Sequence, residues 1–466
     1  MTIFEKASME MRNALIAVGA ATVLLAQTGF PQSGSTDRHT QAGTGPDAGV
    51  WTFAEQPDGK LLVGGNFSNF NGVPHGGIVR LNPDGSFDSG FLSSAGVNGG
   101  EQVYTLLPQP DGKILVGGWF QHCNGQLCTN LARLNADGSF DTTFKASVEG
   151  WVWPMALQPD AKILVGGAMA YADGVARNNI ARLNSDGSLD EGFDAGAGAD
   201  NYTCAIVVQP DGQILIGGCF HNFASVASDL VRLNPDGSLD PTFDNCVGVG
   251  VQDAAFGIVN ELALQPDGKI LVAGWFDNFD QDARTNLARL NSDGSLDTTF
   301  VPAPLAWQTV AGELYGLVLQ PDGKVVIGFW PTNTPGGGPC VACFNSDGSL
   351  DSSFQIGSCS ADGVWTMKLL SNGEIAVGGG FPDFNGAATP YLAWLRCYIA
   401  PFSLGLSWNA SQLELGLFGQ ARQNYTIETA TNLLQFSTWT NIMSTGTDWM
   451  PMVALPQQFF RARTDP

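Results

Sequence analysis

Short apolar segments alternate with polar turns along most of the chain, and no stretch of it shows a helical period. One turn phrase, Gln-Pro-Asp-Gly-Lys, occurs first at residues 56–60 and returns every 49 to 56 residues, ending in a degenerate seventh copy at 371–374. A second phrase, Asn-x-Asp-Gly-Ser-x-Asp, follows each of the first six copies. In such phrases Pro presets φ, Asp bonds its own backbone, and Gly accepts a positive φ. Each phrase therefore predicts a hairpin turn.

Strand-like segments flank both turns of every repeat. In the second repeat, 103–107 and 113–120 flank the first turn, and 130–135 and 139–144 flank the second. Two hairpins of four short strands in about 50 residues suit a propeller blade, and seven units lie within the usual four to eight blades. A β-solenoid would use much shorter repeats, and a helical solenoid needs a period of 3.6 residues. We therefore predict an all-β fold, a seven-bladed β-propeller of four-stranded blades at residues 33–400.

The repeated phrase also resembles a known family. Its consensus, LQPDGKILVGGxF…NLARLNxDGSLDxxF, is similar to the delta-60 repeat, which occurs in secreted bacterial proteins that resemble β-propellers. The resemblance covers about Val50–Arg396. It implies the propeller fold and an exported bacterial protein, and it implies no catalytic residues.

The repeat period ends near Phe402. Beyond it, 413–417, 425–428 and 459–463 alternate in polarity as strands do. We predict a small β-sandwich-like domain at residues 402–466. It resembles short C-terminal modules of secreted bacterial proteins, and a role in sorting, in surface attachment or in capping stays open.

The N-terminal segment predicts export. Arg12 precedes an apolar run at residues 14–26, which is too short to cross a bilayer of about 30 Å. A basic residue, a short apolar core and small residues at its end are typical of a secretory signal peptide, here residues 1–27. A retained anchor and a buried helix are the alternatives. No later segment is long and apolar enough to span a membrane, so we expect a secreted or cell-surface protein.

The seventh repeat lacks its second turn phrase, and the start of the mature chain resembles the missing part. Residues 34–56 align without a gap to residues 187–209, at a constant offset of 153. A ring closed by a borrowed strand has no sheet edge on which to aggregate. We therefore predict that residues 34–41 form the outer strand of the seventh blade.

Charge and cysteine content exclude several classes of protein. The chain has 44 acidic and 21 basic residues, a net charge of −23. DNA binding depends on Lys and Arg that displace counterions, so we exclude nucleic acid as a partner. We expect a monomer. Nine cysteines leave at least one unpaired, and Cys340-Val341-Ala342-Cys343 has the spacing of a zinc knuckle but lacks a second Cys or His pair.

Two recurring polar patterns have both a structural and a functional interpretation. The second turn phrase places oxygens at alternate positions, but it lacks the glutamate of a calcium loop. We therefore expect Asx-stabilised turns and no cofactor, with calcium at some blades as the alternative. One repeat position is Arg in five of seven copies, each a few residues before an Asp. We expect Arg–Asp pairs within blades, with an anion-binding ring as the alternative. These arginines are Arg80, Arg133, Arg182, Arg232 and Arg289.

Aromatic residues recur five residues before the first-turn Gln, in the strand that would line the central channel. The seven repeats carry Trp51, Tyr104, Trp153, Cys204, Asn260, Tyr315 and Trp365 at this position. If Gln56 pairs with Lys60, Trp51 falls opposite Gly65, and a ring that covers a cross-strand glycine is ordinary sheet packing. The other interpretation is an exposed aromatic rim. The connections between blades lead into these strands and add Trp151 and Trp307.

We therefore predict a non-enzymatic binding protein that takes a neutral or weakly basic glycan, or a protein loop, at this face. The predicted ligand-binding residues are Trp151, Trp153, Trp307, Trp365, Trp51, Tyr104 and Tyr315. The four histidines, at 39, 75, 122 and 221, fall at different repeat positions, and no nucleophile elbow or HExxH motif occurs. Paired carboxylates on adjacent blades keep a polysaccharide hydrolase or lyase as an alternative. A purely structural surface protein is the third possibility.

Overall fold

The computed structural model describes residues 44–91, 96–97, 101–244, 257–279, 282–305, 312–330, 338–360 and 362–396, and six strands between 403 and 464. Every regular element in this described part is a β-strand, so the predicted all-β class is confirmed. It accordingly contains no helix able to cross a membrane. The predicted signal peptide (1–27), the predicted closing strand (34–41) and Trp307 lie outside the described residues. The chain divides into two compact units, one of residues 32–370 and 374–396, while the other includes residues 397–466.

The first unit holds seven antiparallel sheets, one from each repeat. The first four contain β1 (Val50–Glu55), β2 (Leu61–Gly65) and β5 (Ile78–Leu81); β6 (Gln102–Pro108), β7 (Ile114–Trp119) and β10 (Leu131–Leu134); β11 (Val148–Leu157), β12 (Ile163–Ala172), β13 (Val175–Ala176) and β14 (Ile180–Leu183); and β15 (Thr203–Val208), β16 (Ile214–Gly218) and β19 (Leu230–Leu233). The other three contain β20 (Ile258–Leu264), β21 (Ile270–Trp275) and β24 (Leu287–Leu290); β25 (Glu313–Leu319), β26 (Val325–Trp330), β27 (Gly338–Phe344) and β28 (Gly357–Cys359); and β29 (Val364–Leu369), β30 (Glu374–Gly379) and β31 (Leu392–Arg396).

Two-residue strands form small hairpins between the second and third long strands of four sheets. They are β3 (Asn69–Phe70) with β4 (Val73–Pro74), β8 (His122–Cys123) with β9 (Gln126–Leu127), β17 (Asn222–Phe223) with β18 (Val226–Ala227), and β22 (Asn278–Phe279) with β23 (Asp282–Ala283).

Both predicted turns form as their residues require. In the first repeat the backbone N–H of Gln56 donates to the carbonyl of Lys60 at 2.8 Å, and Gly59 has a φ of 81°. In the second turn the N–H of Asn82 donates to the carbonyl of Ser86 at 2.8 Å. The tight hairpins predicted from the two phrases are therefore confirmed.

The fourth strand of each repeat is shorter than predicted. In the second repeat it is reduced to a single bridge between Leu134 and Phe140. The carboxylate of Asp141 then accepts the backbone N–H of Thr143 at 3.0 Å, and the N–H of Phe144 donates to the Asp141 carbonyl at 3.3 Å. These hydrogen bonds end the outer strand, because a bond from an Asp side chain to the nearby backbone competes with pairing between strands.

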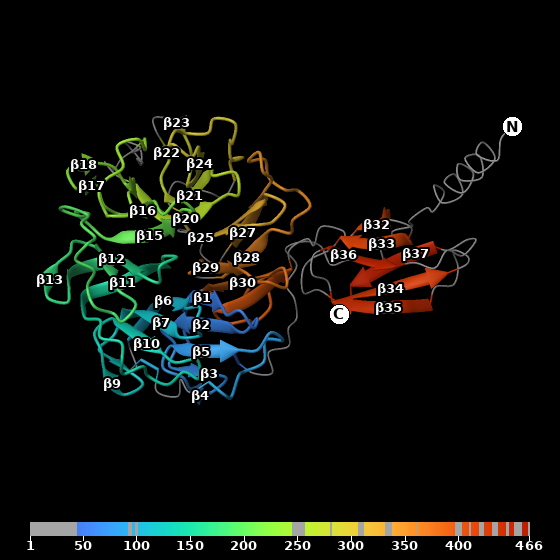
Figure 1. The fold of residues 1–466 in the computed structure, drawn as a ribbon, viewed down its shortest axis with the longest axis horizontal. Coiled ribbons are helices and arrows are strands. Elements are labelled where there is room, and N and C mark those ends of the chain that lie inside the picture. The colour runs from blue at the N-terminus through green and yellow to red at the C-terminus, as the bar shows by residue number, and fades with distance from the viewer. Residues whose placement is uncertain are drawn as a thin grey trace. The chain divides into compact units, whose positions relative to one another are not determined.

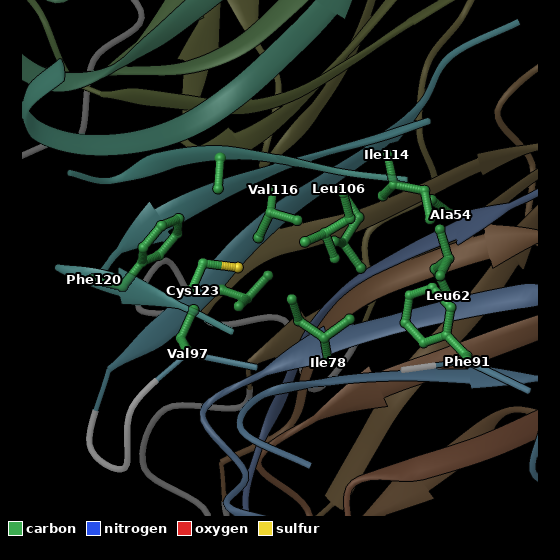
Figure 2. Close-up of a cluster of buried hydrophobic side chains, with 13 residues drawn as sticks. Ala54, Leu62, Ile78, Phe91, Val97, Leu106, Ile114, Val116, Phe120 and Cys123 are labelled. Carbon is green, nitrogen blue, oxygen red and sulfur yellow. The ribbon is translucent and has the colours of Figure 1, made fainter. Parts of the chain in front are cut away.

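Buried apolar side chains fill the space between consecutive sheets. Figure 2 shows the cluster between the first two sheets, where Leu62 and Ile78 lie near Leu106. A similar cluster joins the first sheet to the last, with Phe53 and Val63 packed near Trp394. The first strands of the sheets also contact one another in cyclic order, from β1 through β6, β11, β15, β20, β25 and β29 back to β1 (Figure 1). Each sheet is thus buried on both faces, and only its inner edge faces the common centre.

The second unit contributes two antiparallel three-stranded sheets. One has the order β32 (Ser403–Asn409), β33 (Gln412–Phe418), β36 (Thr447–Pro451). The other has the order β35 (Ser437–Met443), β34 (Asn424–Ala430), β37 (Phe459–Thr464). The three segments predicted as strands from their alternation lie in β33, β34 and β37.

Candidate ligand-binding site

A β-bulge interrupts the pairing of the first two strands at the same place in all seven sheets. In the first sheet Val50 pairs with Gly65 and Thr52 with Gly64, which leaves Trp51 without a partner in the ladder. The prediction that Trp51 lies opposite Gly65 is therefore wrong by one residue. The bulges fall at the repeat position singled out for its aromatic residues, namely Trp51, Tyr104, Trp153, Cys204, Asn260, Tyr315 and Trp365.

A glycine faces the bulge in six of the seven sheets, and Phe329 takes its place in the sixth. A Cβ atom on Gly65 would lie 2.2 Å from the carbonyl oxygen of Gly49, and one on Gly118 would lie 2.0 Å from that of Gln102. No aromatic ring of the bulge position is among the atoms nearest to a Cβ built on Gly65 or on Gly118. A bulge releases one residue from the alternation of faces and redirects its side chain. With both faces of every sheet packed, the bulged residue is the one free to point away from them.

The redirected rings of neighbouring sheets meet one another. Trp51 stacks on Trp365 with ring centroids 4.1 Å apart, and it meets Tyr104 edge-on at 5.7 Å. Tyr104 in turn stacks on Trp153 at 5.3 Å. The distances of 5.3 and 5.7 Å lie within the usual range of favourable aromatic pairs, and the stacked pair Trp51–Trp365 is closer still. The structure therefore brings together residues that are more than 300 positions apart in the chain.

Two further residues extend this set, which we call the ring cluster. Tyr202 lies 6.4 Å from Trp153, and Trp330 lies 6.5 Å from Trp365 and 6.4 Å from Tyr315, measured between ring centroids. The ring cluster consists of Tyr202, Trp153, Tyr104, Trp51, Trp365, Trp330 and Tyr315, all half-buried. Four of the five aromatic residues at the bulge position are thus in direct ring contact, and Tyr315 joins them through Trp330.

Sequence reasoning overlooked Tyr202 and Trp330, although a signal for both exists. Tyr202 stands seven residues before its first-turn Gln, and Trp330 stands ten residues after its own. These two repeat positions pair across the first two strands beside the bulge, as Glu313 pairs with Trp330. Trp119 and Trp151 occupy the same two positions in the second and third repeats. An alignment of the positions that flank the bulge would have found all four.

Trp119 and Trp151 form a second, exposed aromatic pair. Their ring centroids are 6.3 Å apart and their planes are tilted by 56°. Trp119 is 49% exposed and Trp151 is 43% exposed. Trp151 is two residues before Trp153 in β11, so the exposed pair lies at the same end of the inner strands as the ring cluster.

Polar atoms within the ring cluster are mostly engaged. The hydroxyl of Tyr104 donates to Oε1 of Gln102 at 2.7 Å, and the hydroxyl of Tyr315 donates to the carboxylate of Glu313. Burial raises the pKa of Tyr104, and burial followed by the charge of Glu313 raises the pKa of Tyr315. Both hydroxyls therefore stay protonated at neutral pH. Nε1 of Trp51 is buried and has no hydrogen-bond partner among the described residues.

The bulged positions without a ring have other roles. Nδ2 of Asn260 donates to the carbonyl of Leu314 in the next inner strand at 3.1 Å. Cys204 is buried, and burial raises the pKa of its thiol. Glu261, beside Asn260, has its pKa raised to about 7 by burial, against which the charge of Lys368 acts only weakly. This side of the channel is therefore lined by small and polar groups.

The opposite ends of the strands are committed to structure. Nε of each repeat arginine lies 2.6–2.8 Å from Oδ2 of the expected aspartate, which confirms the predicted pairs. Nη1 also donates to a backbone carbonyl in the second turn of the following repeat, and the guanidinium lies 4.5–4.7 Å from the centroid of a phenylalanine ring. The acceptors are the carbonyls of Ala136, Ser185, Pro235, Ser292 and Ser346. Each arginine thus links two adjacent sheets.

These contacts leave the arginines poorly placed to bind an anion. Each guanidinium is already shared among an aspartate, a carbonyl and an aromatic ring. Burial alone would raise the pKa of Asp88, but hydrogen bonds from Lys60, the N–H of Gly90 and Arg80 lower it to about 2. The carboxylate is therefore charged at all physiological pH values, and the pair is permanent.

The cysteines and acidic turns are explained without a metal. Cys340 forms a disulfide with Cys359 between β27 and β28, which removes it from the suspected zinc knuckle. In the second turn, Oδ1 of Asp84 accepts the N–H of Ser86 at 2.9 Å. Across the part of the chain that the structure describes, no three His, Cys, Asp or Glu side chains are grouped to hold a metal ion.

Comparison with known proteins bears on the repeat itself. Residues 56–91, 109–144, 158–193, 209–243, 265–300 and 320–354 each match the family described as "Domain of unknown function (DUF5122) beta-propeller". Each segment begins at the Gln of the first turn phrase. It ends at the phenylalanine three residues after the last Asp of the second turn phrase. No curated protein matches the chain. With six matched copies and seven sheets built on one plan, the chain is a β-propeller repeat protein.

Proposed function

We propose that this is a non-enzymatic binding protein, secreted or at the cell surface, that binds a glycan at the end of the propeller carrying the ring cluster. In this proposal the propeller has seven blades, and residues 402–466 form a separate small β domain. A protein loop in place of the glycan is an outcome of the test below.

The exposed pair Trp119–Trp151 carries the proposal. Monomeric proteins seldom expose contiguous large apolar side chains unless they mark a binding site. Two tilted indoles offer flat apolar faces on which the C–H faces of a pyranose stack. The ring cluster at the same end of the strands carries hydroxyl and carboxylate groups, such as those of Tyr104 and Glu313, which belong to the class of groups that bind sugar hydroxyls.

The two ends of the strands carry different kinds of residue, and this difference supports a binding site at the ring-cluster end. The end opposite the ring cluster carries the Arg–Asp links of the first five repeats and the two recurring turns, which are nearly identical in the first six repeats. The connections between repeats arrive at the ring-cluster end, and their lengths and residues vary. Binding residues are concentrated on variable connections that a rigid scaffold positions.

Residues 44–50 support the proposed closure of a seventh blade by the N-terminal segment. Gly45 has a φ of 72° and its aligned partner Gly198 a φ of 67°. The N–H of Asp47 donates to Asn69 at 3.0 Å, as the N–H of Asp200 donates to Asn222 at 2.9 Å. Residues 198–200 follow the segment of the third repeat that contains the Leu183–Leu189 bridge. From this parallel we propose that the chain before Gly45 supplies the outer strand of the last repeat.

Titration of the full chain with a panel of soluble oligosaccharides tests the proposal. Trp151→Ala should weaken binding by about 2 kcal/mol, because it removes an exposed anchor, and should leave the melting temperature unchanged. Leu127→Ala is the matched control, since Leu127 is 78% exposed and lies on a peripheral hairpin. If Trp151→Ala binds as tightly as the control, the site is elsewhere. If no oligosaccharide binds while a protein partner does, the ligand is a protein.

A further inference from the structure

The third sheet differs from its neighbours by protruding at the ring-cluster end. Its first two strands, β11 and β12, have ten residues each, whereas β6 and β7 have seven and six. The additional residues include Glu149 and Tyr171, which lie just beyond Trp151. All three side chains are exposed, and Tyr171 is 43% exposed.

Strand register places these side chains together. Glu149 pairs directly with Tyr171, so their Cβ atoms are neighbours on one face of the sheet. Glu149 and Trp151 are two residues apart in the same strand, on either side of Gly150, where the register shifts, and both side chains are exposed. The ring of Trp151 meets that of Trp119 from the second sheet at 6.3 Å. We call Trp119, Glu149, Trp151 and Tyr171 the rim patch.

The charge of Glu149 is not neutralised within the patch. The strands β6, β7, β11 and β12 contain no Lys or Arg, and Glu149 has no ion pair among the described residues. The nearest basic residue along the chain is Lys145, four residues before Glu149, and no ion pair joins the two among the described residues; Nη1 of Arg177 donates to the Ala176 carbonyl at 3.0 Å. One carboxylate thus stands among three exposed aromatic rings, on a chain with a net charge of −23.

This combination of groups favours a cation. An ammonium group near an aromatic face is attracted by the ring quadrupole, and an adjacent carboxylate adds an ion pair. A neutral sugar would use the rings but would leave the charge of Glu149 unpaired. We infer that the rim patch takes a glycan with free amino groups, a deacetylated hexosamine chain, whose ammonium lies beside Glu149 while its sugar rings stack on Trp119 and Trp151. This inference rests on the proposed function and names the ligand class of the same site.

The test compares two ligands that differ only in charge. The full chain is titrated with a β-1,4-linked glucosamine hexamer and with its N-acetylated counterpart, at low and at high salt. We expect the amine form to bind about tenfold more tightly at low salt, as an added ion pair and cation–π contact imply. Salt should reduce this preference because it screens exposed charges.

Two variants test which residues cause the preference for the amine form. Glu149→Gln should abolish the preference for the amine form and leave binding of the N-acetylated form unchanged. Glu191→Gln is the matched control, because Glu191 is an exposed acid of the same repeat that lies outside the patch. Trp151→Ala should weaken both ligands.

Each result has a definite meaning. Equal affinity for both hexamers overturns the inference and leaves glycan binding intact. A full preference retained in Glu149→Gln also overturns it. Failure of both hexamers to bind overturns the inference, and failure of the whole oligosaccharide panel overturns the proposed function as well. Circular dichroism and the melting temperature of each variant establish that it is folded.

Discussion

Replacement of Arg133 by methionine tests whether the links between adjacent sheets hold the propeller together. Nε of Arg133 lies 2.7 Å from Oδ2 of Asp141, and Nη1 donates to the carbonyl of Ser185 in the next repeat at 2.5 Å. The guanidinium also lies 4.6 Å from the centroid of the Phe144 ring. Methionine retains much of the apolar stem and removes all three interactions.

The magnitude follows from what the substitution leaves behind. The side chains of Arg133 and Asp141 are only 7% and 4% exposed, so the pair is largely desolvated. Removal of one partner from a buried pair costs about 3–5 kcal/mol, because the other charge stays buried. Lys113 remains 2.9 Å from Asp141 and offsets part of this cost. We therefore expect the free energy of unfolding to fall by about 3 kcal/mol, the lower end of that range.

The sixth repeat supports the lower end of the range expected for the loss in free energy of unfolding. There Cys343 replaces the arginine, and Lys324 lies 2.8 Å from the corresponding Asp351. The sheet β25–β26–β27–β28 nevertheless forms with the same register as the others. One aspartate–lysine pair is thus compatible with the blade, so the variant should fold.

Urea denaturation followed by tryptophan fluorescence measures the change. Arg177→Met is the matched control, because among the described residues the guanidinium of Arg177 bonds only to the carbonyl of its neighbour Ala176. The control should lose less than about 1 kcal/mol, as exposed polar contacts do. If Arg133→Met is no less stable than the control, the links between sheets contribute as little as surface pairs, and the reasoning fails.

Two further predictions concern the channel and the ends of the chain. Burial raises the pKa of Glu261 to about 7 from its ordinary 4.5, so the folded state retains a proton that the unfolded state releases. Stability should therefore fall by about 3 kcal/mol as pH rises from 4.5 to above 7. Glu261→Gln should remove this loss, and equal slopes of unfolding free energy against pH in both proteins would contradict it. Deletion of residues 34–41 should lower the melting temperature by several degrees, because it opens the seventh blade. An unchanged melting temperature would count against the closure.

Local chemistry made much of the fold accessible from sequence. The turns depend on consecutive residues such as Pro57, Asp58 and Gly59, so the sequence alone predicted their place, number and geometry. The pairing of Arg80 with Asp88 is equally local, since both lie beside one tight turn. The prediction of four strands in each repeat was less accurate, because the hydrogen bonds of Asp141 shorten the outer strand.

The binding end, in contrast, was decided by tertiary structure. The bulge at Trp51 shifts the register by one residue, and the backbones of Gly49 and Gly65 approach closely beside it. No local propensity encodes that approach. The contact of Trp51 with Trp365 further requires the first and last sheets to meet, which only the packing of the whole ring provides. Sequence therefore determined which residues recur, while tertiary packing determined which way they point and which of them meet.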